Sequence, residues 1–191
     1  PPIFPGIGSA VFNLYGRELQ QGMADFPHAN AVLALLRDGF VEQSPGGSIR
    51  LADDGSPMLD YELSDYVWEG VKRAYLSMAE LQFAAGAQRV RQAHIDASYQ
   101  TSWTDAKKAI AELPLKKFRA TLFTAHLMGG CAMSQNPKRG VVDSGGRHHQ
   151  LANLSVMDGS VFPTSIGANP QLSIYGLVAQ NATALAKQLK T

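Results

Sequence analysis

Hydrophobic residues recur every three or four positions between Ser64 and Ala85, with polar residues between them. This spacing places the apolar side chains on one face and predicts a long amphipathic helix. Ser64 or Asp65 can cap its N-terminus, and Gly86 is suited to end it. The apolar positions are Val67, Val71, Ala74, Tyr75, Met78, Leu81 and Ala85.

Two further helices are predicted. A shorter one runs from Thr104 to Leu113 and ends before Pro114, which cannot continue it. A closing helix is predicted by "NPQLSIYGLVAQNATALAKQLK", in which Asn169 lies at or beside the N-cap and Pro170 suits the first turn. The apolar face of this closing helix consists of Leu172, Ile174, Val178, Ala182, Leu185 and Leu189.

Shorter runs predict β-structure. Residues 48–51 and 58–63 alternate partly between apolar and polar side chains, and the turn Asp53-Asp54-Gly55 joins them, which predicts an antiparallel hairpin. The β-forming residues of "KKFRATLFTAHLM" predict a strand that ends near His126. The segment "NLSVMDGSVFP" predicts another short strand, which stops at Asp158-Gly159.

The composition excludes several classes of partner and site. Seventeen basic and sixteen acidic side chains leave no field that would attract nucleic acid or an anionic membrane. The apolar runs are shorter than the roughly 20 residues that a transmembrane helix needs. The single cysteine, Cys131, excludes an internal disulfide and a multi-cysteine metal site, and is expected to be small buried filler. With 45% hydrophobic residues the chain can still form a sizeable core.

His126 and the glycine pair that follows it are the first candidates for chemistry. A histidine in an apolar run is a possible acid or base, although it can equally be a satisfied core or boundary residue. Gly129 and Gly130 remove side chains where the backbone could pass close to a planar cofactor. The alternative for the glycine pair is a tight turn.

A second group of candidates follows Asn153. Asp158-Gly159 resembles places where a carboxylate meets a ribose or ribityl hydroxyl, although the same dipeptide is common in turns. Asn169-Pro170 begins the closing helix, whose free N–H groups and positive dipole end favour an oxyanion or an anionic ring. The alternative is that Asn169 simply caps the helix.

In this order, "HLMGGCAM", "GVVD", "NLSVMDGSVFPTSIGANPQLSI" and the closing helix resemble the C-terminal signature of the glucose-methanol-choline family of flavin oxidoreductases. The segment from "GGSIRLADDGSPMLDYELSD" to "AAGAQRV" is similar, more loosely, to the hairpin and helix of that family's substrate domain. The combination of Gly-Gly-Cys and Asn-Pro is similar to the bacterial sterol oxidase branch, which differs from the more frequent Gly-Thr-Cys form.

The resemblance implies an FAD-dependent enzyme that oxidises an alcohol, which in the sterol-like branch is bulky and apolar. His126 would accept the hydroxyl proton while a hydride passes to the flavin, and Asn169 would orient the substrate oxygen. Gly129 and Gly130 would allow close approach of the flavin. Asp158 and Gly159 would contact the ribityl-phosphate region of FAD, and Asn169, Pro170 and Gln171 would contact the edge of the flavin ring.

The elements and the resemblance together predict an α+β fold. It consists of an antiparallel sheet with flanking helices, followed by a C-terminal strand and helix that belong to an FAD domain. Residues 1–125 would form a substrate-binding domain, and residues 126–191 would complete the FAD-binding domain.

The family's N-terminal phosphate loop has no counterpart in the sequence. "GIGSAV" begins as G-x-G, but Val11 stands where the third glycine belongs and no strand precedes it, so we expect a turn there. The start "PPIFPGIG" indicates an interior cut, and the resemblance implies that a missing N-terminal FAD-binding region is the partner of this chain.

Two other interpretations remain open at this stage. One is a binding or structural module that keeps the family fold but never holds a flavin. The other is a metal site built from His126, His148 and His149, although no zinc-type spacing of Cys and His is present. His148-His149 is otherwise expected in an exposed turn after Gly145-Gly146.

Overall fold

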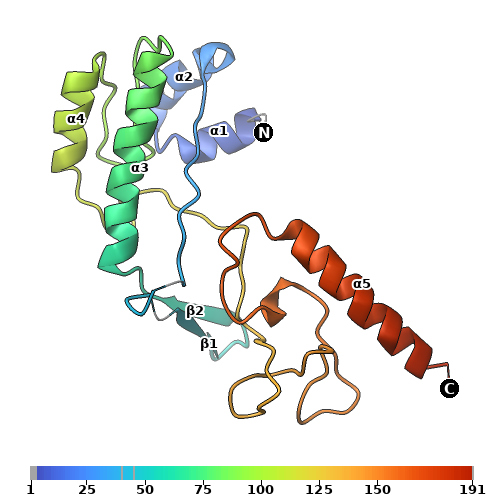
Figure 1. The fold of residues 1–191 in the computed structure, drawn as a ribbon. Helices are drawn as coiled ribbons and strands as arrows, with labels where there is room; N and C mark the ends of the chain where they lie inside the picture. Colours follow the sequence, from blue (N-terminus) through green and yellow to red (C-terminus); the bar gives the residue numbers. More distant parts are fainter. Residues whose placement is uncertain (1–3, 40, 45, 191) are drawn as a thin grey trace. The chain divides into compact units, whose positions relative to one another are not determined.

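The structure, a computed structural model, describes residues 4–39, 41–44 and 46–190. Along the described chain the order of elements is α1 (Pro5–Val11), α2 (Gly16–Ala24), a 3-10 turn η1 (Phe26–His28), β1 (Gly47–Leu51), β2 (Pro57–Tyr61), α3 (Asp65–Ala84), α4 (Trp103–Glu112), a 3-10 turn η2 (Gly159–Val161) and α5 (Gln171–Gln188) (Figure 1). The fold is therefore mixed, mostly helical, with one two-stranded antiparallel sheet among the described residues.

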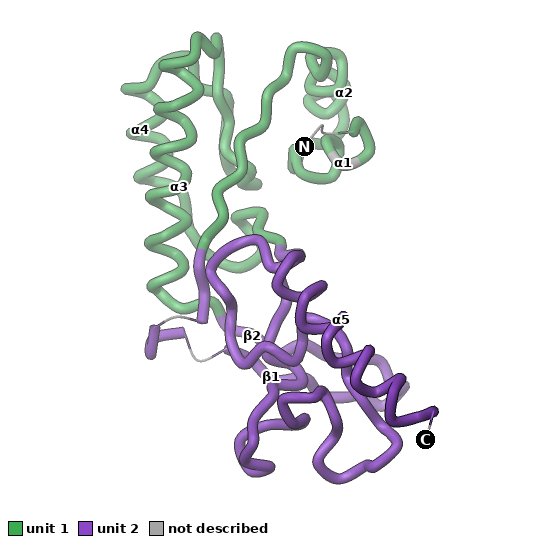
Figure 2. Tube along the Cα trace, turned by 45° about the vertical axis from the view of Figure 1, so that its right-hand side comes forward, with its two compact units in different colours: residues 1–36, 63–123 green, residues 37–62, 124–191 purple. Residues whose placement is uncertain are grey.

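The chain divides into two compact units (Figure 2). Unit 1 comprises residues 1–36 and 63–123, and unit 2 comprises residues 37–62 and 124–191. The hairpin and α5 belong to unit 2, whereas α3 and α4 belong to unit 1. The predicted flavin-binding role of the segment from residue 126 onward stays a prediction.

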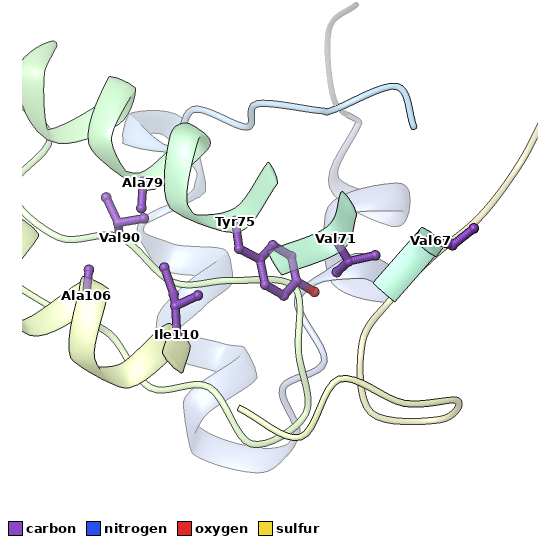
Figure 3. Close-up of a cluster of buried hydrophobic side chains, with 7 residues drawn as sticks. All are labelled: Val67, Val71, Tyr75, Ala79, Val90, Ala106 and Ile110. Atoms are coloured by element: carbon purple, nitrogen blue, oxygen red, sulfur yellow. The ribbon is translucent and has the colours of Figure 1, made fainter. Parts of the chain in front are cut away.

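Helix α3 supplies the core of unit 1 through a stripe of residues spaced by four. Its buried residues Val67, Val71, Tyr75 and Ala79 pack with Val90 and with Ala106 and Ile110 of α4 (Figure 3). A four-residue ridge of this kind is a usual surface for packing one helix on another. The predicted helix is confirmed, but Leu81 is wrong as a core position. It is 58% exposed, since it lies two residues beyond Ala79 and faces a different direction.

The boundaries of α3 and α4 follow the expected local chemistry. Helix α3 stops before Gly86, whose positive φ of 90° is readily adopted by glycine. The hydroxyl of Ser102 caps α4 by accepting from the backbone N–H of Asp105 at 3.1 Å, and Pro114 follows the end of the helix. The shorter predicted helix is therefore confirmed to within a residue.

The segment from Gly6 to Val11 forms most of α1, so the predicted turn is wrong. Pro5 is the first helical residue, where a missing N–H leaves no partner unsatisfied. The G-x-G pair lies inside this helix, and no strand precedes it among the described residues. This geometry differs from that of a phosphate-binding loop between a strand and a helix.

The predicted hairpin is confirmed in unit 2. Ile49 pairs with Leu59 across the two strands, and the turn places Gly55 at a φ of 80°. The N–H of Gly55 donates to the carbonyl of Ala52 at 2.9 Å and closes the turn.

The two other predicted strands are wrong. "KKFRATLFTAHLM" forms no strand, and "NLSVMDGSVFP" forms the 3-10 turn η2 but no strand. In the described residues their only β-pairing is in the isolated bridges His94–Ala120 and Arg147–Ser155. A strand needs a neighbour along its length to take up its N–H and C=O groups, and a single bridge satisfies only one position. The expected C-terminal strand is therefore not formed in the described chain.

The closing helix is confirmed as α5, but its predicted apolar face is only partly covered. Ile174 and Val178 are half-buried, whereas Leu172 and Leu189 are 83% and 79% exposed. Asn181 is buried, and its amide donates to the carbonyl of Ser144 at 3.2 Å. This bond fixes α5 to the loop that contains Ser144. No described helix has the length and apolar character that crossing a membrane requires.

Candidate active site

The two motifs singled out in the sequence lie against each other in unit 2. The N–H of Cys131 donates to the carbonyl of Ser160 at 3.0 Å, and the N–H of Met133 donates to the carbonyl of Val161 at 2.7 Å. These bonds align the loop that follows His126 with the turn that follows Asp158. Segments that are far apart in the sequence are thereby held side by side by their backbones.

Gly129 and Gly159 allow this close packing. Gly129 has a φ of 85°, a conformation that side chains disfavour, and a Cβ there would lie 3.4 Å from the carbonyl oxygen of Pro163. A Cβ on Gly159 would lie 2.8 Å from the Cδ1 of Ile174 on α5 and 3.6 Å from the carbonyl oxygen of Leu127. Gly159 therefore brings the loop, the turn and the first turns of α5 together.

Gly130 differs from its neighbour. Its φ lies outside the left-handed region, and the nearest atom to an added Cβ is the Cβ of Ser160, at an ordinary contact distance of 3.9 Å. Gly130 is exposed, so the packing of this chain does not require a glycine there. A requirement for glycine at this position would have to come from a bound group.

His126 lies in an irregular segment and is half-buried. Its backbone N–H donates to the Oγ1 of Thr124 at 3.2 Å, which turns the chain locally. Among the described residues its imidazole ring forms no hydrogen bond or ion pair. The ring nitrogens are therefore not committed to holding the fold.

Asn169 is exposed and does not cap α5. The N-cap position is held by Pro170, and no side chain accepts from the first turn of the helix. The alternative that Asn169 is an ordinary cap is therefore not realised. In the described part of the chain no hydrogen bond joins the side chains of His126 and Asn169.

The N-cap residue of α5, Pro170, has no side chain that can accept from the backbone N–H groups of the first turn. The N–H of Ile174 donates to the carbonyl of Pro170 at 2.9 Å, which is the first helical bond. The three N–H groups before it point out of the N-terminus, where the helix dipole is positive. Gln171 is exposed and donates from Nε2 to the hydroxyl of Tyr175 at 2.6 Å.

Asp158 has a local structural role. One carboxylate oxygen, Oδ1, accepts from the backbone N–H of Ser160 at 2.8 Å and from its hydroxyl at 2.5 Å, so that Asp158 caps η2. The turn considered as the alternative for Asp-Gly is thus present. Asp158 is exposed, and its other oxygen has no hydrogen-bond partner among the described residues.

His148 and His149 are engaged in loop hydrogen bonds. The Nδ1 of His148 accepts from the N–H groups of Gln150 and Leu151, and the Nε2 of His149 lies 2.9 Å from the carbonyl oxygen of Ser134. No cluster of three or more potential metal ligands occurs within the described ranges. The two histidines thus contribute to loop structure, and they are not arranged with His126 as a ligand set.

Sequence reasoning missed several residues that shape this region. Thr124 orients the backbone at His126. The carbonyl of Ser160 accepts from the N–H of Cys131, and the hydroxyl of Ser160 donates to Asp158. Ile174 packs on Gly159. Thr124 and Ser160 each lie two residues from their partner, the spacing of local Ser/Thr and Asp turns, which is the one signal that could have identified them. Ile174 had no comparable signal, because its contact is long-range.

Comparison with known proteins identifies relatives of the whole region. The sequence profile of GMC oxidoreductases matches residues 43–177. A long-chain-alcohol oxidase of Arabidopsis thaliana, FAO4A, is 27% identical over 185 residues, which cover 93% of this chain and 24% of that protein. An uncharacterized GMC-type oxidoreductase of Sinorhizobium fredii, y4nJ, is 31% identical over 149 residues, 76% of this chain and 29% of the relative.

A shorter match has higher identity. A cholesterol oxidase of Acinetobacter baumannii is 51% identical over 55 residues, which make up 29% of this chain and 10% of that protein. The chain spans about a quarter of the length of the curated relatives that it matches along most of its length.

Proposed function

Because the chain belongs to the GMC oxidoreductase family, as its C-terminal domain, we propose that it is part of an enzyme that oxidises the CH–OH group of an alcohol with FAD as the oxidant. The observation that carries this proposal is the backbone pairing of the loop after His126 with the turn after Asp158, within the region that matches the family. It brings together two motifs whose residue types suit flavin chemistry.

The residues present fit part of an FAD molecule. Gly130 presents bare backbone, the first turn of α5 presents N–H donors, and Asp158 retains an acceptor oxygen. These groups match the needs of a flavin ring, which carries carbonyl oxygens, and of a ribityl chain, which carries hydroxyls. We propose that Gly129, Gly130, Asp158, Gly159, Asn169, Pro170 and Gln171 form this chain's share of the FAD site.

His126 is proposed to act as the general base. FAD, when bound, accepts the hydride that leaves the alcohol carbon. The imidazole of His126 accepts the hydroxyl proton, so that the alcohol loses one proton and one hydride and becomes a carbonyl compound. A ring without structural hydrogen bonds is free to take that proton, and a positioned base typically contributes a rate factor of about a hundred to ten thousand.

Asn169 and the start of α5 are proposed to position the reactants. The carboxamide of Asn169 can donate to the substrate oxygen, which becomes more negative as the proton leaves. The N-terminal end of α5 favours negative charge on any group placed before it, because its first N–H groups and its dipole point there. His126 and Asn169 thus have complementary roles, one as an acceptor and one as a donor.

The substrate is proposed to be a bulky, apolar alcohol. The relatives named above include a long-chain-alcohol oxidase and a cholesterol oxidase, and the Gly-Gly-Cys and Asn-Pro motifs resemble the sterol oxidase branch. The adenosine and pyrophosphate part of FAD would be held by a separate N-terminal region that carries the phosphate loop. The greater length of the relatives supports the proposal that a separate region holds this part of FAD.

The test is anaerobic reduction of the flavin by a panel of alcohols. The protein that carries this chain is purified together with its N-terminal region, and its absorbance is followed after mixing with a long-chain alcohol, a sterol, methanol and glucose. We expect bound flavin and its rapid bleaching by the long-chain alcohol or the sterol. A folded protein that retains no flavin would instead support a non-catalytic module, and bleaching by glucose or methanol alone would refute the substrate class.

A further inference from the structure

A polar cavity of about 270 Å³ lies within unit 1, between the loop that follows Arg91 and the C-terminal end of α4. None of the residues assigned to the flavin or to catalysis lines it. Its wall is formed by Gln92, Asp96, Ala97 and Ser98 of the loop and by Ala109, Glu112, Leu113 and Pro114 at the end of α4. Its volume is below the roughly 300–1,000 Å³ of pockets for drug-sized ligands, so it suits a smaller molecule.

The loop that forms one wall is held firmly. Val90 and Gln100 exchange two backbone hydrogen bonds of 2.9 Å, which close its ends. The fully buried His94 accepts from the N–H of Asp96 at Nδ1, and its Nε2 lies 3.1 Å from the carbonyl oxygen of Pro114. The ring is therefore assigned as the neutral tautomer with the proton on Nε2. These bonds hold the wall in place before any ligand arrives.

Gln92 is the exception in this well-paired loop. The residue is only 6% exposed and lines the cavity, yet its side-chain amide forms no hydrogen bond with the described residues. Buried polar side chains almost always have a partner. Unlike the Ser64 hydroxyl, the Gln92 amide is not fully closed off from solvent, and Gln92 is one of the residues that line the cavity. An amide held in this way indicates a polar occupant.

The charges around the cavity select the sign of that occupant. Glu112 is exposed and forms no ion pair in the part of the chain that the structure describes, and the negative end of the α4 dipole lies beside it. Asp96 adds a second carboxylate, which is partly neutralised by Arg119 at 2.9 Å. No lysine or arginine is among the described residues that line the cavity, although the Nε of Arg91 donates to the carbonyl of Ala97 at 2.8 Å. Glu112 is therefore the lining carboxylate without a cationic partner among the described residues, and a cation is favoured beside it.

We propose that this cavity binds the primary ammonium group of a small ligand. An ammonium has three N–H donors and no acceptor. The cavity offers three matching acceptors, which are the amide oxygen of Gln92, the carboxylate of Glu112 and the hydroxyl oxygen of Ser98. The hydroxyl already accepts from Gln100 at 2.9 Å and retains a second lone pair. The ligand is either a free amine or the side chain of a lysine on a partner.

Titration with n-butylammonium tests the proposal, with the neutral 1-butanol as the matched ligand. The experiment uses the protein that carries this chain and follows the side-chain amide resonances of Gln92 together with heat of binding. We expect saturable shifts with the amine and none with the alcohol. Both readouts are independent of flavin, so failure here would leave the proposed oxidation untouched.

Three variants make the result specific. Glu112→Gln keeps the shape and removes a charge at the surface, and it should weaken amine binding roughly fivefold. Gln92→Met removes the amide acceptor from a buried position, and it should weaken binding at least roughly tenfold. Glu80→Gln, on the exposed side of α3, makes the same charge change outside the cavity and should leave binding unchanged.

The outcomes are clear in each direction. Tighter binding of Nα-acetyl-lysine methylamide than of n-butylammonium would identify a partner's lysine as the ligand, and equal binding would identify a free amine. A cavity that holds only water would show no saturable binding of the amine, and that result would overturn the proposal. Equal weakening by Glu112→Gln and Glu80→Gln would also overturn it, because it would reveal only a general effect of charge.

Discussion

Gly130→Ala separates the packing of the chain from the binding of the flavin. An added Cβ would lie 3.9 Å from the Cβ of Ser160, and the φ of Gly130 is not left-handed, so the fold accepts the methyl group. The free energy of unfolding should change by less than about 0.5 kcal/mol, or rise slightly because alanine restricts the unfolded chain. If the backbone of Gly130 lies against the flavin, the same methyl group should lower FAD retention.

Gly129→Ala is the matched control. Its φ of 85° is unfavourable for alanine, which should lower the free energy of unfolding by about 1–2 kcal/mol. Urea unfolding and the ratio of flavin to protein absorbance are measured for both variants in the protein that includes the N-terminal region. The reasoning fails if Gly130→Ala destabilises the protein as much as Gly129→Ala does, or if it keeps full flavin content.

Three other substitutions test the fold. Tyr75→Phe removes a 2.9 Å hydrogen bond and should lower the free energy of unfolding by about 1 kcal/mol in urea titrations at neutral pH. Burial raises the pKa of Tyr75 to about 12 from the ordinary 10.0, so the unfolded chain loses this proton first as the pH rises. The difference between wild type and variant should therefore shrink between pH 10 and pH 12, and a constant difference would contradict the assignment. Gly146→Ala places a Cβ 2.6 Å from the carbonyl oxygen of Val156 at a φ of 79°. Thermal unfolding should therefore show a larger loss of stability than Gly145→Ala, whose φ is not left-handed. Equal losses of stability in the two variants would contradict this prediction. Ser102→Ala removes the cap of α4 and should lower the free energy of unfolding by about 1 kcal/mol, whereas Ser102→Asp should largely retain it.

Helices α3, α4 and α5 were predictable from the sequence because their signals are local, whereas α1 was expected as a turn and α2 was not predicted. The stripe of α3, the proline after α4 and the start of α5 each depend on residues within a few positions of one another. The hairpin was predictable for the same reason, since Gly55 sets the turn. The strand expected before His126 was wrong, because β-forming residues specify a strand only when a neighbouring strand is present.

The candidate site was predictable only in part. The motifs identified the two segments, and their backbone pairing through Cys131 and Met133 follows from long-range packing that spacing does not reveal. The turn at Asp158, where its carboxylate caps η2, had been considered from the sequence. That Asn169 does not cap α5 could be learned only from the structure. The cavity beside Gln92 had no sequence signal, because its walls come from a loop and a helix end.

The most direct test of the central claim is the rate of anaerobic flavin reduction in His126→Ala, measured by stopped-flow absorbance with the alcohol that the wild-type protein oxidises fastest. His28→Ala, which changes an exposed histidine at the end of η1, serves as the control. The account predicts that His126→Ala retains flavin and slows its reduction by roughly a hundred- to ten-thousandfold, while His28→Ala leaves the rate unchanged. An unaltered rate in His126→Ala would contradict the account.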